Sequence, residues 1–186
     1  MMEALFAETR ERMEKAVDAV RREFAKIRTG KATVSLLDGV KVEAYGSTVP
    51  LRQVANISVP EARLLVVQPW DKKLLGDIEK AIQAADLGLN PSNDGNIIRV
   101  PIPPLTEERR KELVRHVHKL AEEGRVAVRN VRRDVNETLK EMQKNGDISE
   151  DEYHRAHDKT IQEMTDESTH EIDAALAAKE AELMEV

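Results

Sequence analysis

The stretch PIPPLTEERRKEL, residues 101–113, marks the point where the chain changes from short strands to long helices. Its three prolines lack a backbone donor and interrupt any helix that reaches them. Thr106 is a good N-cap, and the two glutamates that follow it suit the positive end of a helix. We therefore expect a helix to begin here and to run to about Lys144, where Asn145-Gly146 ends it.

Long helices are also expected on either side of this one. Apolar residues recur at threes and fours from Met2 to Arg28, which is the period of an amphipathic helix, and Gly30 follows as a stop. Ser149-Glu150-Asp151-Glu152 has the pattern of a capping box and begins a helix that reaches nearly to Val186. Because amphipathic helices owe most of their stability to packing, the three helices are expected to form one elongated bundle.

The segment between the first two helices has a different period. Val40 and Val42 alternate with charged residues, and Tyr45-Gly46-Ser47 marks a turn. A helix with Asp71 as its N-cap is expected to run to about Ala85. The strands predicted in this segment are Val54 to Val59, Leu64 to Gln68 and Ile97 to Ile102.

Together these elements predict an α+β fold with two domains. An elongated three-helix bundle comprises residues 1–30 and 105–186, and a small β/α domain of residues 31–104 is inserted in it. The chain passes between the domains twice, so we expect a two-strand hinge. Glycine supplies backbone freedom there and the prolines restrict it, which favours rigid-body reorientation. The hinge residues are Thr29, Gly30, Lys31, Pro103, Pro104 and Leu105.

The composition limits the classes of function. The 186 residues carry a net charge of −6 and include no cysteine, which excludes disulfides, a thiol nucleophile and thiolate metal sites. No apolar run approaches the length of about 18 residues that a membrane span requires. We therefore expect a soluble, intracellular protein with no membrane partner. The single tryptophan, Trp70, is expected to pack at the start of the small domain's helix.

Positive charge is concentrated in RVAVRNVRRDVN, residues 125–136, which holds four arginines in nine positions of an acidic chain. On a helical wheel they occupy a sector beside the apolar one, and Asn136 and Lys140 extend this sector. The last three of these arginines lack an acidic residue four positions away on their own stripe, so we expect their guanidinium groups to be available. Guanidinium groups suit bidentate contacts with phosphate, which favours an RNA-containing partner.

An enzymatic function has little support. There is no glycine-rich phosphate loop, and the turn Asn90 to Gly95 lacks the lysine of the Walker pattern. Of the five histidines, only His154 and His157 share a helical face, so three metal ligands cannot be assembled from them. We therefore expect no catalytic residue, no metal site and no cofactor.

Several long stretches resemble the bacterial ribosome recycling factor family. They are KIRTGKA at 26–32, YGSTVPLRQVANI at 45–57, EKAIQAADLGLNPSNDGNIIRVPIPPLTEERRKEL at 79–113 and RVAVRNVRRD at 125–134. The resemblance extends from end to end of the chain and closes with KEAELMEV. Two departures are minor: Lys31 stands where many members carry Arg, and Ala44 where a second Tyr commonly precedes Tyr45-Gly46.

The resemblance implies an L-shaped molecule with an outline like transfer RNA, and a cytoplasmic function in recycling ribosomes after translation termination. Family members bind the post-termination ribosome and, with elongation factor G and GTP, promote its splitting into subunits and the release of messenger RNA and deacylated transfer RNA. The bundle is implied to contact large-subunit ribosomal RNA, by shape and phosphate more than by base reading. Carried over by position, the RNA contacts are Arg129, Arg132 and Arg133, with Arg125, Arg110 and Arg28 as further contacts.

The residues alone leave other interpretations open. The arginines either form a solvated face or pair with acids on the neighbouring helices, as surface charge runs often do. In that case the chain is a helical adaptor or chaperone without ribosome affinity. In either case we expect a monomer, because the long helices can satisfy one another within the chain.

Overall fold

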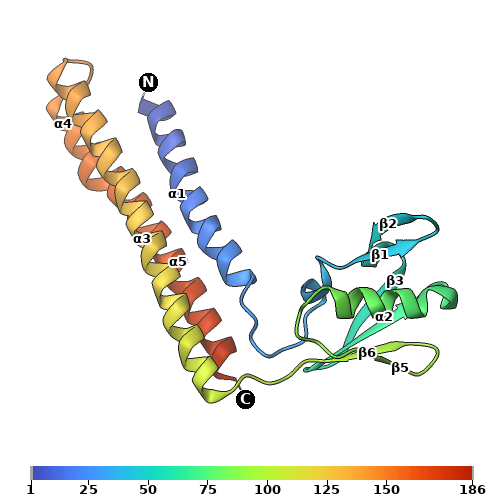
Figure 1. The fold of residues 1–186 in the computed structure, drawn as a ribbon. Coiled ribbons are helices and arrows are strands. Elements are labelled where there is room, and N and C mark those ends of the chain that lie inside the picture. The colour runs from blue at the N-terminus through green and yellow to red at the C-terminus, as the bar shows by residue number, and fades with distance from the viewer. Residues whose placement is uncertain (1, 186) are drawn as a thin grey trace. The chain divides into compact units, whose positions relative to one another are not determined.

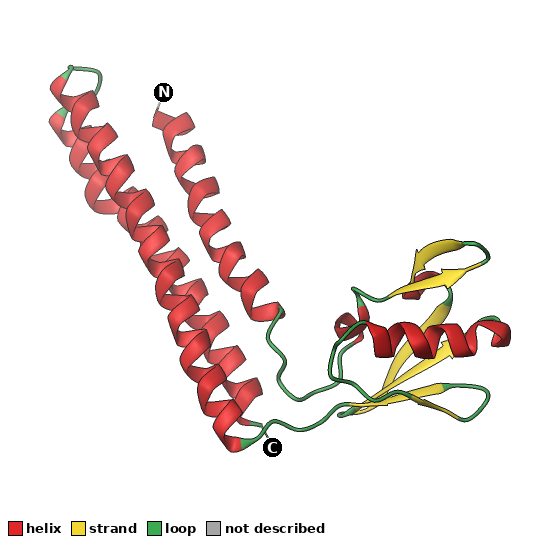
Figure 2. Ribbon diagram, in the orientation of Figure 1, coloured by secondary structure: helices red, strands yellow, loops and turns green. Residues whose placement is uncertain are grey.

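The computed structural model describes residues 2–185, and the chain divides into two compact units, each described by itself (Figure 1; Figure 2). The first unit comprises the residues up to Arg28 and those from Glu107 onward, and the second runs from Thr29 to Thr106. Residues 1 and 186, which the sequence assigns to the bundle, lie outside the described residues. The elements confirm the α+β class, because one unit is helical and the other contains a sheet.

The first unit is a bundle of long helices, in which α3 packs against both α1 and α5, and α1 packs against α5 (Figure 1). The predicted bundle is therefore confirmed. No helix within residues 2–185 is long and apolar enough to cross a membrane. The elements of this unit are α1 (Met2–Ala25), α3 (Glu107–Lys144), α4 (Glu150–His154), the π-helical segment η4 (Arg155–Thr160) and α5 (Ile161–Met184).

Two of the predicted helices differ from the structure. The first ends at Ala25 rather than at Arg28, and beyond it only turn-type backbone bonds remain, such as that from Ile27 N to Phe24 O at 3.1 Å. The last helix begins at the predicted Ser149 capping box, which is confirmed, but it is not continuously α-helical. Its backbone widens into a π-helix at Arg155–Thr160, where the buried residues Ala156 and Ile161 are five positions apart.

Gly124 sets the distance between α3 and its two neighbours. A Cβ atom at this position would lie well inside contact distance of the Val20 side chain on α1, and 3.3 Å from Ile172 Cδ1 on α5. Val20 and Ile172 are both buried. The three helices therefore approach one another closely at a position where α3 has no side chain.

The second unit packs helix α2 against a small antiparallel sheet (Figure 2). Four strands have the order β3-β4-β6-β5, and β1 pairs with β2 in a separate hairpin. Leu65 and Val67 of β4 alternate with more exposed residues and share one core with Ile78 and Ile82 of α2. The strands and helix are β1 (Lys41–Ala44), β2 (Ser47–Pro50), β3 (Ala55–Glu61), β4 (Leu64–Pro69), α2 (Leu75–Ala84), β5 (Ser92–Asn93) and β6 (Ile98–Pro101).

Most elements of this unit were predicted correctly from short stretches of sequence. The Asp71 cap is confirmed, because its side chain accepts a hydrogen bond from Lys73 N, although the first turn is a 3₁₀-helix, Lys72–Leu74. Strand β3 continues through Glu61, where the sequence predicts a separating turn. The prediction for Trp70 was wrong: its ring is not packed at the helix start, and the residue is 68% exposed.

Replacing Gly124 with alanine tests the close approach of the helices. Alanine is favoured over glycine in a helix interior by about 1 kcal/mol, but overpacking against the short, buried Val20 side chain costs about 1–3 kcal/mol. We expect Gly124→Ala to lower the free energy of unfolding of the bundle, measured by urea denaturation. Gly76→Ala is the matched control, because Gly76 lies in α2 with open space around its Cβ position, and this variant should be neutral or stabilised. A stabilised Gly124→Ala variant would contradict the close approach.

Candidate nucleic-acid interface

The four arginines of residues 125–136, here called the arginine face, lie on α3 beside its buried stripe. Val128, Val131 and Val135 of this stripe are buried, as the helical wheel predicts. The face borders α5, because Arg125 and Arg132 both contact side chains of that helix. The members of the arginine face are Arg125, Arg129, Arg132 and Arg133.

Arg125 joins α3 to α5. Its guanidinium lies 2.7 Å from Asp173 Oδ1 on α5 and 3.0 Å from Glu122 Oε2, and its side chain is only 22% exposed. The hydrogen bond to Asp173, more than any other contact, raises the pKa of Arg125. The charge of Arg125 is thus compensated by an acid on a neighbouring helix, which is the alternative that the sequence left open.

Arg129 is also paired, which corrects the expectation that its guanidinium is available. Its Nη2 donates to Glu122 Oε1 at 2.7 Å. Glu122 lies seven positions earlier, two turns along the helix, so a search limited to four positions misses it. The hydrogen bonds from Arg129 and then from Arg125 lower the pKa of Glu122, so this carboxylate stays ionised and serves both arginines.

Arg132 and Arg133 have neutral hydrogen-bond partners instead. Arg132 Nη1 donates to Gln162 Oε1 on α5 at 3.2 Å, and Gln162 Nε2 donates in turn to Asp166 at 2.9 Å. Arg133 Nη2 donates to Asn130 Oδ1 at 2.6 Å. No carboxylate within residues 2–185 forms an ion pair with either guanidinium. Positive charge is therefore left uncompensated at these two arginines.

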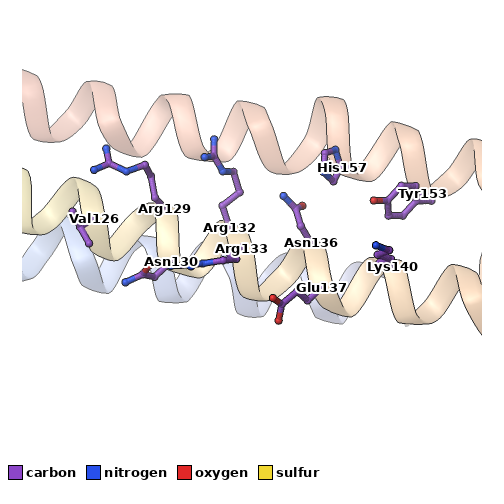
Figure 3. Close-up of a pocket in the computed structure, with 10 residues that line it drawn as sticks. All are labelled: Val126, Arg129, Asn130, Arg132, Arg133, Asn136, Glu137, Lys140, Tyr153 and His157. Atoms are coloured by element: carbon purple, nitrogen blue, oxygen red, sulfur yellow. Dashed lines mark hydrogen bonds between the residues drawn. The ribbon is translucent and has the colours of Figure 1, made fainter.

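A surface groove of about 640 Å³ runs along this part of α3 and is closed on one side by α4 and η4 (Figure 3). Figure 3 shows Arg132 and Asn136 pointing from α3 toward the neighbouring helix, whereas Glu137 points away from it. We call it the arginine groove, and it is lined by Val126, Arg129, Asn130, Arg132, Arg133, Asn136, Glu137, Lys140, Tyr153 and His157.

The other two predicted RNA contacts lie elsewhere. Arg110 is in the first turns of α3, about 22 Å along the helix axis from Arg125. It is half-buried, and its Nε has no hydrogen-bond partner among the described residues. Arg28 is exposed and follows the end of α1. Neither residue lines the arginine groove.

The predicted hinge residues lie at the two places where the chain enters and leaves the small unit. Gly30 has a φ of +79°, in the left-handed region that favours glycine. A Cβ atom at Gly30 would lie 3.3 Å from Leu105 N and 3.4 Å from Leu105 Cγ. The two segments of chain therefore touch at this point.

One wall of the arginine groove was not predicted from the sequence. Tyr153 and His157 form its second wall, and Gln162 orients Arg132. Tyr153 and His157 are four positions apart, which puts them on one side of a helix. The spacing therefore predicts that the two rings lie close together, but it does not predict which neighbouring helix they face.

The fold and the groove define a two-unit α+β protein whose helical bundle carries a cationic surface groove. The family described as ribosome recycling factor matches residues 20–184 of the chain. Ribosome-recycling factor from Bacillus licheniformis is 59% identical over 179 residues, with 96% of each chain covered. That from Bacillus subtilis is 57% identical over 186 residues, with all of each chain covered.

Solved structures agree with these relatives. A solution structure of a ribosome recycling factor is 48% identical, covers 99% of this chain and 97% of its own, and superposes with a TM-score of 0.77. A model of the T. thermophilus ribosome recycling factor, with the E. coli elongation factor G on the E. coli post-termination complex, is 49% identical over the full length of both chains, with a TM-score of 0.65. The chain belongs to the ribosome recycling factor family.

The different environments of the arginines predict different effects on stability. Arg125→Gln removes two charge-assisted bonds from a mostly buried side chain, so we expect the free energy of unfolding to fall by about 1–2 kcal/mol. Arg133→Gln is the matched control, because Arg133 is exposed, and it should change stability by less than about 0.5 kcal/mol. Urea denaturation followed by circular dichroism measures both. Equal losses would show that Arg125 does not hold α3 to α5.

Proposed function

We propose that this chain acts in ribosome recycling after translation termination, as membership of its family implies. It binds the post-termination ribosome and, with elongation factor G and GTP, promotes splitting into subunits with release of messenger RNA and deacylated transfer RNA. The solved relative on a post-termination complex with elongation factor G supports these partners. In this proposal the chain works in the cytoplasm as a monomer, and it catalyses no reaction itself.

The observation that carries the proposal is the pair Arg132 and Arg133, whose guanidinium groups have only neutral partners on an open groove. Guanidinium groups that are not neutralised by carboxylates are suited to phosphate oxygens of ribosomal RNA. Arg129 joins them, because its link to Glu122 is exposed and easily exchanged for a phosphate. Arg125 is assigned mainly to holding α3 against α5. Arg110 and Arg28 are proposed as contacts outside the groove.

We also propose that the two chain crossings act as a hinge. Gly30, in its left-handed conformation, lies beside Leu105. The two connecting segments of chain are therefore adjacent and can bend about one common axis. Lys31 and Thr29 flank the glycine, and Pro103 and Pro104 stiffen the return segment. Elongation factor G then moves the small unit as a rigid lever while the bundle stays bound to the large subunit.

Light scattering of post-termination ribosomes tests the function. With wild-type protein, elongation factor G and GTP, we expect scattering to fall as the ribosomes split. Arg132→Glu places a negative charge at the phosphate contact, so the splitting rate at limiting protein concentration should fall by about tenfold or more. Arg22→Glu is the matched control, since Arg22 is an exposed arginine on α1, and it should split ribosomes at the wild-type rate.

The salt dependence separates this function from that of a helical adaptor or chaperone without ribosome affinity. Binding through phosphates releases counterions, so affinity for ribosomes falls steeply as salt rises. An adaptor that binds a protein by apolar contacts shows little salt dependence. Wild-type protein that neither binds nor splits ribosomes with a matched elongation factor G would refute the proposal.

A further inference from the structure

One end of the arginine groove differs in chemistry from the rest, because aromatic rings form its wall. The ring of Tyr153 on α4 lies 5.5 Å from that of His157 on η4, with the planes tilted by 34°. It lies 5.3 Å from that of His154, at a steep angle of 68°. His157 Nδ1 also lies 2.7 Å from Asp158 Oδ1, which fixes the orientation of the imidazole ring. Tyr153 and His157 are half-buried, so the groove wall holds these rings in place.

Cationic side chains of α3 line the groove beside this aromatic wall. Lys140 lines the same part of the groove, and Arg132 and Arg133 follow along α3. The one carboxylate in the lining is Glu137, and its side chain points away from the aromatic wall (Figure 3). The groove therefore offers a flat apolar surface with positive charge at its edge.

Asn136, between the arginines and the rings, has an unsatisfied hydrogen-bonding group. Its Oδ1 is buried and has no hydrogen-bond partner among the described residues. Such a group costs free energy until it finds a partner, and Asn136 lines the groove, where a ligand can supply one once the side chain rotates. A phosphate offers no hydrogen to an acceptor, whereas the edge of a nucleobase offers N–H groups.

The backbone of this wall is also unusual. Six residues, Arg155–Thr160, form the π-helical segment that carries His157. Short π-helical segments within α-helices are frequently found at functional sites. In this chain the segment supplies His157 to the groove wall and directly follows Tyr153 on α4.

We propose that the aromatic end of the arginine groove holds one unstacked nucleobase of the RNA partner, stacked against Tyr153. This inference rests on the proposed function, and it adds a base contact to phosphate contacts. Arg133 and Lys140 bind the phosphates on either side of the base, and Asn136 reads its edge. Sequence-tolerant stacking on aromatic rings is a common way to bind unpaired bases, and it requires the combination found here of a ring and nearby positive charge.

Two other occupants fit the groove less well. Phosphates alone would leave both the aromatic wall and Asn136 Oδ1 unused. An acidic peptide would use the cations, and its backbone N–H groups could donate to Asn136, but its carboxylates offer no planar ring to stack on Tyr153. The planar base with N–H groups is the occupant that uses all three features.

The test measures the affinity of the full chain for isolated large ribosomal subunits over a series of salt concentrations. Tyr153→Ala removes the stacking surface, so we expect binding about tenfold or more weaker, with an unchanged slope of log affinity against log salt. Tyr153→Phe keeps the ring and should bind within about twofold of wild type. Arg133→Gln should weaken binding and make the slope shallower by about one. Tyr45→Ala, at an exposed tyrosine of the small unit, is the control for loss of an aromatic ring.

The outcomes separate the base contact from the proposed function. If Tyr153→Ala binds like wild type while Arg133→Gln binds weakly, the base contact is wrong and the proposed function stands. A weakened Tyr153→Ala variant with a changed slope, or one not rescued by Tyr153→Phe, would also overturn it. If wild-type protein does not bind the subunits, the proposed function itself fails.

A photo-crosslinking amino acid in place of Tyr153 identifies the occupant directly. Crosslinking of bound protein to an RNA nucleotide supports the proposal, because the ring would lie against the base. Crosslinking to a ribosomal protein overturns it in favour of a peptide occupant.

Discussion

The packing of α3 against both α1 and α5 is the constraint on which the rest of the bundle depends. Gly124 allows a close approach to both helices, and the next residue, Arg125, lies within reach of Asp173 on α5. Arg125 is close enough to α5 to form an interhelical ion pair with Asp173. Two turns further along, the α5 side chain that meets Arg132 is the amide of Gln162 rather than an acid. The same helix pair therefore gives Arg125 a carboxylate that balances its charge and gives Arg132 a neutral amide partner.

The sorting of charge around α3 explains how an acidic chain carries a cationic groove. Asp134, on the other flank of α3, pairs with Arg12 of α1 at 2.9 Å, so this acid is used between helices. Glu122 and Asp173 gather at the Arg125 end of the arginine face. The two arginines without a carboxylate partner, Arg132 and Arg133, lie on the side of the arginine face nearer to Lys140. An acidic remainder limits nonspecific adhesion to nucleic acid, while the local charge is retained where a specific partner would meet it.

Much of the fold could be predicted because its signals are local. The start of α3 after the prolines, the Ser149 capping box and the Asp71 cap each depend on a few neighbouring residues. The π-helical segment could not be predicted, because one step of five positions between buried residues, Ala156 to Ile161, is too short a signal to distinguish from an α-helical pattern. The exposure of Trp70 also depends on which elements cover it, and local sequence does not contain that information.

The candidate site, like the fold, could be predicted from the sequence only in part. The clustering of arginines on one side of α3 follows from helical spacing, but their partners do not, because arginine reaches two turns along its own helix and across to the next. Glu122 and Asp173 show these two cases. Tyr153 and His157 became part of the site only through the packing of α4 and η4 on α3. Sequence therefore indicated one wall of the groove and missed the other.

An amide partner suits Arg132 for a reason of electrostatics. Gln162 is itself oriented by Asp166, since its Nε2 donates to that carboxylate and leaves Oε1 facing Arg132. The guanidinium is thus held in one position by a hydrogen bond that carries no net charge. A carboxylate in the same place would orient Arg132 equally well, but it would compete with a phosphate for the guanidinium. Positioning without neutralisation keeps the full charge available for an anionic partner, and this distinguishes Arg132 from Arg125 on the same helix.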